Sequence, residues 1–467
     1  MDQNDQNEPN ETRQERAYGI LKELTSKGFK AYIVGGAVRD TILEKIPEDW
    51  DIFTDATGEK LLEIYPDGKI IGNEERQEKI LTVVVDGTEV STFRSNPTRT
   101  ETGGSLLEHQ GTCDFTINSL AMDMDGTIYD STGGEMDLFH KVIRAVGDPK
   151  DRISEDPLRI LRAIRFAVKY DFQIDPELVE VIQNTSIRII AVERIREEFM
   201  KIIQYSAGPI LLDRLGLLPQ IFYWWPTMRI PGGKYHGEQV DEHSFYCHNI
   251  MCNYTDDPLL KFTALVHDIG KPISATMKDD GNLTFIGHDI EGAKAIHKEM
   301  ERMKFSLKET AYVEALIRNH QYPLKIKAET SSFRGFHRAF RALEDAKVPI
   351  EHLILLRYCD RQANLKTHRE TYTDFLTKYI GSDAYYTIKY NRIPIRTTEL
   401  WLDGDEIMTI FGLEPGPKVG IIMKYLLKLS WRGNFHDLTT MLNYINKQKK
   451  GIENHVKREE EKLNVSN

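Results

Sequence analysis

The sequence is poor in cysteine and has no long hydrophobic run. Four thiols in 467 residues, Cys113, Cys247, Cys252 and Cys359, are too few for the disulfide framework of a secreted scaffold. No segment approaches the ~20 consecutive apolar residues that a membrane span requires. The polar N-terminal segment, residues 1–14, also lacks the apolar stretch of a signal peptide. We therefore expect a cytoplasmic protein with reduced cysteines.

The chain has no excess of basic residues. It contains 61 lysines and arginines against 72 acidic residues, which gives a net charge of −11. The overall charge gives no support for nucleic-acid binding, although a local basic surface can coexist with an acidic chain. The composition is 40% hydrophobic and 28% charged, as in ordinary globular proteins. At roughly 150 residues per domain, this length indicates about three domains with cores of their own.

The pattern of elements changes along the chain. Up to Gly147, short strands alternate with helices, and the Asp-Gly pair within TVVVDGTEVSTF predicts a β-hairpin. After Gly147 the strand signals stop, and apolar residues recur at helical spacing, as in PLRILRAIRFAVKY. The predicted fold class is α+β, a small mixed sheet with helices followed by an all-α region. The predicted parts are a disordered segment (1–14), a head (15–147), a helical neck and body (148–228), a histidine-rich helical domain (229–395), a helical tail (396–450) and a charged end (451–467).

Two adjacent glycines, Gly35 and Gly36, follow a short apolar strand and precede a predicted helix. Such a turn lets the backbone approach an anion closely, and a helix N-terminus adds free N–H groups. Taken alone, the pair favours a simple tight turn. The acidic residues that follow about ten positions later favour a binding role.

Asp49 and Asp51 lie on one face of a predicted strand, with Trp50 on the other. Two such carboxylates repel each other unless a cation lies between them. Mg²⁺ prefers hard oxygen ligands of this kind and also binds substrate phosphates. Glu89, on a neighbouring strand, is the expected third carboxylate of a two-metal site that activates an attacking hydroxyl. The alternative for an isolated Asp-x-Asp is a solvated strand face.

A second polar set lies in the helical region. Its members are His243, His267, Asp268, His288, His320 and Asp360, each on or beside a predicted helix. Imidazole and carboxylate ligands can hold a divalent transition metal and leave positions open for water. The metal lowers the pKa of that water and makes it a nucleophile towards phosphate esters. The alternative is a scatter of unrelated histidines, since the chain has 14.

The motifs of the head occur in a recognisable order. They are GGAVRD (35–40), DWDIFTDA (49–56), EVSTFR (89–94), DFTINSLA (114–121), RISEDPLRILRAIRFA (152–167), ERIREE (193–198), DGDEIM (403–408) and GLEPGPKVG (412–420). This order resembles the class II tRNA nucleotidyltransferase and bacterial poly(A) polymerase family, which belongs to the DNA polymerase beta superfamily. The resemblance extends from about residue 18 to residue 431 and implies a polymerase-beta-like head.

The resemblance also implies roles for single residues. Asp49, Asp51 and Glu89 would be catalytic and would bind Mg²⁺. The nucleotide would be bound by Gly35, Gly36, Arg39, Asp114, Asn118, Glu155, Asp156, Arg159 and Arg162. The family's Arg-Arg-Asp, which recognises ribose, is replaced here by Thr112, Cys113 and Asp114. A cysteine cannot supply the donor fork of a guanidinium, so this departure puts ribose selection in question.

The Glu-Asp-x-x-Arg element would recognise the incoming base. Asp156 and Arg159 are three residues apart, so we expect them on one helix face. A carboxylate can accept from the amino group of cytosine or adenine, while arginine donates to a ring nitrogen or carbonyl. The alternative is a helix-start motif, because an Asp before Pro is a common cap.

The histidine–aspartate set, with its HDIGK segment at 267–271, resembles the HD phosphohydrolase superfamily. His288 and His320 correspond to the extra ligands of its two-metal members. A subset of tRNA nucleotidyltransferases has such a domain, which resembles a phosphatase or 2′,3′-cyclic phosphodiesterase. The resemblance therefore implies a bifunctional enzyme with Mg²⁺ in the head and a divalent transition metal in the HD site.

The leading hypothesis is addition of CCA to the tRNA 3′ end from CTP and ATP. A poly(A) polymerase is the first alternative, but that group usually has a Gly-Arg-Arg-Phe run where this chain has residues 71–75. A second alternative is an HD phosphohydrolase whose head only binds RNA. In alarmone synthetase–hydrolases the HD domain precedes the transferase, which is the opposite order.

Overall fold

The protein is described here from a computed structural model. The described residues are 10–71, 82–93, 104–233, 236–321, 341–366, 369–376, 397–430, 434 and 437–465. The chain divides into two compact units, residues 1–225 and 226–467, and each is considered by itself. None of the helices described over these ranges is both long and apolar enough to cross a membrane.

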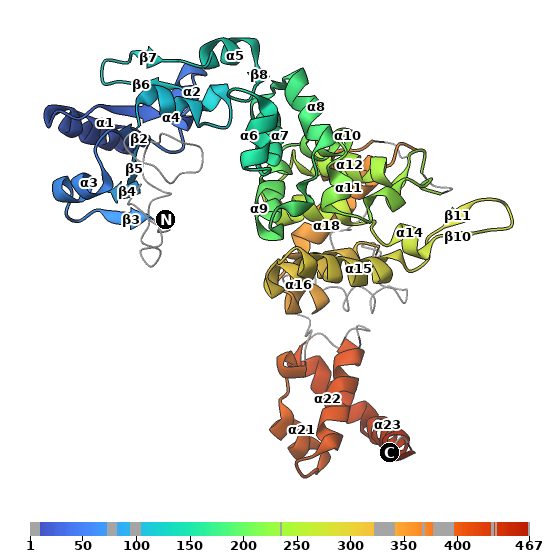
Figure 1. The fold of residues 1–467 in the computed structure, drawn as a ribbon. Coiled ribbons are helices and arrows are strands. Elements are labelled where there is room, and N and C mark those ends of the chain that lie inside the picture. The colour runs from blue at the N-terminus through green and yellow to red at the C-terminus, as the bar shows by residue number, and fades with distance from the viewer. Residues whose placement is uncertain are drawn as a thin grey trace. The chain divides into compact units, whose positions relative to one another are not determined.

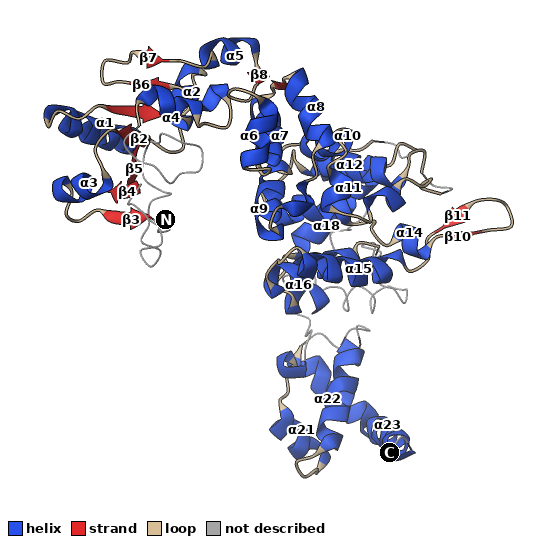
Figure 2. Ribbon diagram, in the orientation of Figure 1, coloured by secondary structure: helices blue, strands red, loops and turns tan. Residues whose placement is uncertain are grey.

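The first unit is built on a seven-stranded mixed sheet of order β3-β4-β5-β2-β1-β6-β7 (Figures 1 and 2). Its strands are β1 (Ala31–Val34), β2 (Asp51–Thr54), β3 (Lys69–Ile71), β4 (Thr82–Val85), β5 (Thr88–Thr92), β6 (Ala121–Met122) and β7 (Ile128–Tyr129). β2 and β5 are parallel, and the other neighbours are antiparallel. The α+β class is therefore confirmed.

The predicted Asp-Gly hairpin is present between β4 and β5. Val85 pairs with Thr88, so Asp86 and Gly87 form a two-residue turn. Both have positive φ, 48° and 83°, as the turns that match the twist of two strands require. This hairpin brings β5 beside β2 and so sets the position of Glu89 relative to Asp51.

Helices surround the sheet and continue beyond it in the first unit. They are α1 (Asn10–Ser26), α2 (Gly36–Ile42), α3 (Gly58–Ile64), α4 (Leu106–Gly111), α5 (Gly134–His140), α6 (Pro149–Glu155), α7 (Arg159–Tyr170), α8 (Pro176–Asn184), α9 (Val192–Ile202), α10 (Gly208–Arg214) and α11 (Leu218–Ile221). In α7, Leu161 and Ile164 are fully buried at helical spacing, as predicted. α1 begins at Asn10, within the segment that the sequence led us to expect as disordered.

The second unit is almost entirely helical over its described residues (Figure 2). Its helices are α12 (Val240–Met251), α13 (Pro258–Val266), α14 (Lys271–Ser274), α15 (His288–Arg302), α16 (Leu307–Asn319), α18 (Ile350–Ala363), α19 (Tyr372–Phe375), α21 (Gly404–Phe411), α22 (Pro417–Ser430) and α23 (Leu438–Val465). One apolar cluster, which includes Met251, Leu316, Leu353, Leu426 and Met441, joins eight of them.

Short strands also occur where the sequence predicted helices alone. β8 (Val142–Ile143) pairs in parallel with β9 (Gln173–Ile174), and β10 (Thr276–Met277) pairs with β11 (Leu283–Thr284). Each has two residues, too few to produce an alternating pattern in the sequence. β8 lies before Gly147, but the expectation that strands end at Gly147 was wrong for β9, β10 and β11.

Candidate functional site

A cleft of about 1080 Å³ opens in the first unit. It is lined from β1, α2, β2, α4, α7 and α9, and from the segments between them. Among its lining residues are Gly35, Gly36, Arg39, Asp49, Asp51, Asp114, Asn118, Glu155, Asp156, Arg159 and Arg162. The fold thus brings together the predicted nucleotide-binding residues, which are up to 127 positions apart (from Gly35 to Arg162), along with two of the three predicted carboxylates.

The three carboxylates gather at the start of β2. Asp51 is the first residue of β2, and the parallel register pairs Ile52 with Val90, so Asp51 falls opposite Glu89. Trp50 is buried and Asp49 exposed, but both precede β2, so the expectation that Asp49 lies on this strand was wrong. Burial, followed by the charges of Glu89 and Asp49, raises the pKa of Asp51 to about 7. Such crowding of hard oxygen ligands is relieved by a divalent cation, so these residues fit Mg²⁺.

Gly35 forms the turn between β1 and α2. Its φ is +63°, a conformation that favours glycine over residues with a side chain. Its N–H donates to the carbonyl of Leu120 at 3.0 Å, which ties the turn to the end of the Phe-Thr-Ile-Asn segment. The glycine is therefore needed for the turn itself, and the cleft lies beside it.

Four polar side chains form a continuous chain along the cleft. Arg39 donates through Nη1 to Oδ1 of Asn118, and Asn118 donates through Nδ2 to Oδ1 of Asp114 at 2.9 Å. Arg162 donates through Nε to Oδ2 of Asp114 at 2.7 Å. Burial alone would raise the pKa of Asp114, but Arg162 and Asn118 lower it below its ordinary value. The cleft therefore holds an ionised carboxylate between two arginines.

Thr112 and Cys113 stand where the related family has two arginines. Both side chains turn back towards the end of α4: the Thr112 hydroxyl donates to the carbonyl of His109 at 2.7 Å, and the Cys113 thiol lies 3.7 Å from the same oxygen. Neither supplies a positive charge. The guanidinium groups nearest Asp114 come instead from Arg162 and, through Asn118, from Arg39.

The Glu-Asp-x-x-Arg element is a turn and not one helix. α6 ends at Glu155, and Asp156 is extended with φ −151° because Pro157 cannot continue the helix. The expectation that Asp156 and Arg159 share a helix face was wrong, although both line the cleft. Glu155 accepts from Arg159 Nη1, and Asp156 Oδ2 accepts from Arg194 Nη2 at 2.7 Å.

Several cleft residues were missed in the sequence. Arg194 of α9 lines the cleft; it lies within the ERIREE motif (193–198), in which no single residue was assigned a role from the sequence. The arginine and lysine side chains along the cleft are Arg39, Arg159, Arg162, Arg165, Lys169 and Arg194. They form the local basic surface that a net charge of −11 leaves possible. Cationic residues at helical spacing in α7 were the available signal.

The histidine–aspartate set of the second unit also converges. His243 lies in α12, His267 and His320 directly follow the last residues of α13 and α16, and His288 is the first residue of α15. His243, His267 and His320 are fully buried, and Asp268 is 1% exposed. The fold therefore collects all six predicted ligands, including Asp360 of α18, in one interior cluster.

Asp268 lies at the centre of this cluster. Its Oδ2 is 3.2 Å from Nε2 of His267 and 2.6 Å from Nζ of Lys271. Its Oδ1 is 3.5 Å from Nε2 of His288 and 3.8 Å from Nε2 of His320. Burial, then His267 and His288, lower the pKa of His320 to about 3. His320 is thus neutral near pH 7 and can offer a ring nitrogen to a metal.

Two atoms at the centre are unsatisfied. Nε2 of His267 and Oδ1 of Asp268 are buried and have no hydrogen-bond partner among the described residues, whereas Oδ2 of Asp268 is paired with the ammonium of Lys271. Such groups are costly to bury unless a cation or water completes them. His243, His267 and Asp268 offer ligand atoms within 4.8 Å of one another, as do Asp268, His288 and His320. The residues therefore fit a divalent metal.

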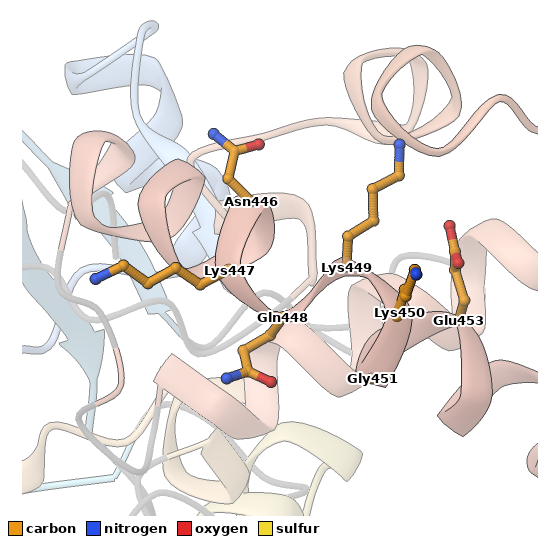
Figure 3. Close-up of a pocket in the computed structure, with 7 residues that line it drawn as sticks. All are labelled: Asn446, Lys447, Gln448, Lys449, Lys450, Gly451 and Glu453. Carbon is orange, nitrogen blue, oxygen red and sulfur yellow. The ribbon is translucent and has the colours of Figure 1, made fainter.

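A further hollow of about 470 Å³ lies along α23 (Figure 3). It is lined by residues 446–451 and 453 of this single helix. The side chains point outward in different directions and do not converge, and Lys449 is engaged with the carbonyl of Ile410 at 2.6 Å. The hollow offers no arrangement of groups comparable with the two polar clusters.

Known families match segments that contain residues of both clusters. Residues 31–144 match the poly A polymerase head domain, and residues 240–365 match the HD domain. Between them, residues 171–228 match a segment described as a probable RNA and SrmB-binding site of polymerase A. The chain therefore contains a poly A polymerase head domain and an HD domain, which confirms the resemblance seen in the sequence.

Curated relatives match the chain in part. It is 37% identical over 229 residues to a CCA-adding enzyme of Geobacillus sp. (strain WCH70), covering 46% of this chain and 55% of that protein. It is 39% identical over 213 residues to a CC-adding tRNA nucleotidyltransferase of Halalkalibacterium halodurans, covering 44% of this chain and 54% of that protein. It is 36% identical over 215 residues to poly(A) polymerase I of Salmonella typhi (42% and 46%). The chain thus spans about half the length of these relatives.

Solved structures share the fold over most of the chain. The CCA-adding enzyme of Bacillus stearothermophilus in complex with CTP aligns with a TM-score of 0.65 and 23% identity, covering 96% of this chain and all of that one. A tRNA nucleotidyltransferase complexed with a primer tRNA and an ATP analogue aligns with a TM-score of 0.52 and 18% identity, covering 80% of this chain and all of that one. At these identities the likeness concerns the fold alone.

Proposed function

We propose that the first unit adds CMP, CMP and AMP to the 3′ end of tRNA from CTP and ATP, without a nucleic-acid template. The observation that supports this most directly is the joint presence of the carboxylates Asp49 and Asp51 and the base-recognition residues Asp156 and Arg159 in one cleft. Relatives named as CCA-adding and CC-adding enzymes, matched over about half their length, agree with this proposal.

The reaction is an in-line displacement at phosphorus. The 3′-oxygen of the tRNA forms a bond to the α-phosphorus of the nucleoside triphosphate, the bond from that phosphorus to the bridging oxygen breaks, and pyrophosphate leaves. Mg²⁺ bound by Asp49, Asp51 and Glu89 would supply activation of the hydroxyl and neutralisation of the phosphate charge. The net positive charge along the cleft would favour binding of the substrate phosphates, since phosphoryl transfer depends on positioning and charge stabilisation.

Base selection falls to the turn between α6 and α7. Asp156 can accept a hydrogen bond from the exocyclic amino group of cytosine or adenine. Arg159 can donate to a ring nitrogen or a carbonyl on the same base edge. Glu155 holds Arg159, and Arg194 holds Asp156, so both recognition groups are fixed before the nucleotide arrives. The tRNA would be recognised by shape and backbone.

The second unit is proposed to hydrolyse a phosphate ester, with a 2′,3′-cyclic phosphate at an RNA end as the expected substrate. His243, His267, Asp268, His288, His320 and Asp360 would hold a divalent transition metal, which supplies a bound water of lowered pKa as nucleophile. The unsatisfied buried atoms of His267 and Asp268 support this role.

Poly(A) synthesis is the second candidate, because poly(A) polymerase I of Salmonella typhi matches 42% of the chain at 36% identity. The Gly-Arg-Arg-Phe argument rests on residues 71–75, of which 72–75 lie outside the described residues. An HD phosphohydrolase with an RNA-binding head is the third. This third candidate gives no function to the carboxylates Asp49 and Asp51, which the fold holds close together.

Chain extension of three tRNA transcripts separates these candidates. The transcripts end before CCA, after C and after CC, and each receives Mg²⁺ with CTP, ATP or both. When both nucleotides are present, the proposal predicts that these transcripts gain three, two and one nucleotides, respectively. Adenosine should be added only at the last position. A long adenosine ladder would establish poly(A) synthesis, and growth that stops after CC would establish CC addition. Failure of all three transcripts to grow would contradict the transferase proposal.

A further inference from the structure

The four histidines of the HD cluster are not held in the same way. Nδ1 of His267, His288 and His320 each faces a backbone carbonyl three residues earlier, at 2.9, 2.7 and 2.6 Å. Nδ1 of His243 instead faces the carboxylate of Glu238, at 3.1 Å. A carbonyl only accepts, so in all three carbonyl-bound rings Nδ1 is protonated and Nε2 offers its lone pair. His243 differs because its partner is an anion.

Glu238 is built into the interior. Its side chain is 1% exposed, and its Oε1 lies 2.9 Å from Nδ1 of His236 as well as facing His243. Its Oε2 accepts the backbone N–H groups of Gly237 at 2.9 Å and Leu365 at 3.2 Å. Four groups thus contact the Glu238 carboxylate, and together they fix its orientation towards His243. Its neighbour Leu365 follows α18, the helix of Asp360.

The cluster has two unequal halves, divided by Asp268. On the side of Oδ2 lie His243, His267, Asp360 and the ammonium of Lys271, with Nε2 of His243 3.1 Å and Nε2 of His267 3.7 Å from Oδ1 of Asp360. On the side of Oδ1, the ligand candidates among the described residues are His288 and His320, whose Nε2 atoms are 3.2 Å apart. The first half therefore has a second carboxylate, and it alone has an imidazole backed by an anion.

We propose that Glu238 is a positioning residue for His243 and makes the half formed by His243, His267, Asp268 and Asp360 the tighter of two divalent-metal sites. This inference rests on the metal-dependent role proposed for the second unit. An ionised carboxylate behind an imidazole fixes the Nδ1–H form and increases the electron density at Nε2 more than a neutral carbonyl does. Loss of such an outer partner typically weakens metal binding about 10–100-fold.

Mn²⁺ titration of the full-length protein tests the inference. The parent is the Asp49→Ala/Asp51→Ala variant, so that the transferase cleft does not contribute to the isotherm. Glu238→Gln keeps the size of the side chain but removes its charge. Glu242→Gln is the matched control, because Glu242 lies four residues further on and its carboxylate caps α12 through the N–H of Gln239 without facing a histidine. His288→Ala marks the weaker half.

The expected parent isotherm has two unequal steps. Glu238→Gln should weaken the tighter step about 10–100-fold and leave the weaker one unchanged. His288→Ala should remove only the weaker step, and Glu242→Gln should change neither. Thermal unfolding without metal should be similar for Glu238→Gln and the parent, since a purely structural role would lower the melting temperature with and without Mn²⁺ alike.

Two results would overturn the inference and are distinguishable. If Glu238→Gln keeps the tighter affinity within about twofold of the parent, Glu238 does not position His243. If the parent and a His267→Ala/Asp268→Ala derivative give the same isotherm, the second unit holds no Mn²⁺, and the metal-dependent role fails together with the inference.

Discussion

At the scale of single residues, the chemistry of the first unit depends on charges that the fold forces together. Asp51 is held against Glu89 and Asp49, and Asp114 is held between Arg162 and Asn118. Asp51 is thus surrounded by other carboxylates, whereas Asp114 is paired with a guanidinium. The alternation of Asp49, Trp50 and Asp51 made the first set predictable from the sequence. The partner of Asp114 was not, because Arg162 is 48 positions away.

The crowding at Asp51 predicts a pH-dependent stability. Its folded pKa of about 7 lies above the ordinary 3.8, so the folded state holds a proton that the unfolded state loses first. Stability therefore falls as pH rises from about 4 to about 7. In EDTA, Asp51→Asn should raise the melting temperature at pH 8 and have little effect near pH 4. The gain should be about 2–4 °C per kcal/mol of burial cost and repulsion removed from the ionised carboxylate.

Thermal unfolding of the two proteins in EDTA at several pH values checks this prediction. A melting-temperature difference that is the same at pH 4.5 and pH 8 would show that Asp51 is not electrostatically crowded. Addition of Mg²⁺ should reverse the order, because the cation stabilises the native carboxylate and has less to bind in Asp51→Asn.

Arg162 is predicted to replace the arginines that the chain lacks at Thr112 and Cys113. Arg162→Ala leaves Asp114 without its cation and should raise KM for CTP and ATP about tenfold, as a charge-assisted hydrogen bond is worth about 1.5–3 kcal/mol and Arg162 is partly exposed. Steady-state kinetics measure this, with Arg188→Ala, an exposed residue outside the cleft, as control. Equal KM values for both variants would assign nucleotide binding elsewhere.

At the scale of elements, the turn between α6 and α7 matters most. The sequence indicated that Asp156, Pro157 and Arg159 belong together, but periodicity placed Asp156 on a helix. The proline ends α6 and leaves Asp156 extended. The Asp156 carboxylate then accepts a hydrogen bond from Arg194 of α9. This contact joins residues far apart in the chain, so no local sequence pattern predicts it. Local residue preferences therefore located the recognition element, and tertiary contacts decided its geometry.

Arg194 should affect base selection more than turnover. Arg194→Ala frees Asp156 and should reduce the preference for CTP over UTP about twofold to fivefold, since Arg194 is half exposed and such ion pairs are worth about 0.2–1 kcal/mol. The ratio of kcat/KM for the two nucleotides measures this. Arg196→Ala is the control from the same helix. If both variants keep the wild-type ratio, Asp156 is positioned without α9.

At the scale of the whole molecule, each compact unit has its own polar cluster. The sequence predicted a change after residue 228, and the structure divides the chain after Trp225. Strands of four or five residues were predictable because their apolar and β-branched residues form runs, whereas two-residue strands such as β8 and β9 leave no pattern. Glu238 was missed because its role depends on His243 and Leu365 meeting it in space.

Two double variants test the central claim, that the two clusters perform separate reactions and the first elongates tRNA. Full-length wild type, Asp49→Ala/Asp51→Ala and His267→Ala/Asp268→Ala each receive a tRNA transcript lacking CCA, with Mg²⁺, CTP and ATP. We predict three added nucleotides for the wild type and for His267→Ala/Asp268→Ala, and none for Asp49→Ala/Asp51→Ala. Undiminished extension by Asp49→Ala/Asp51→Ala, or no extension by the wild type, would contradict the account.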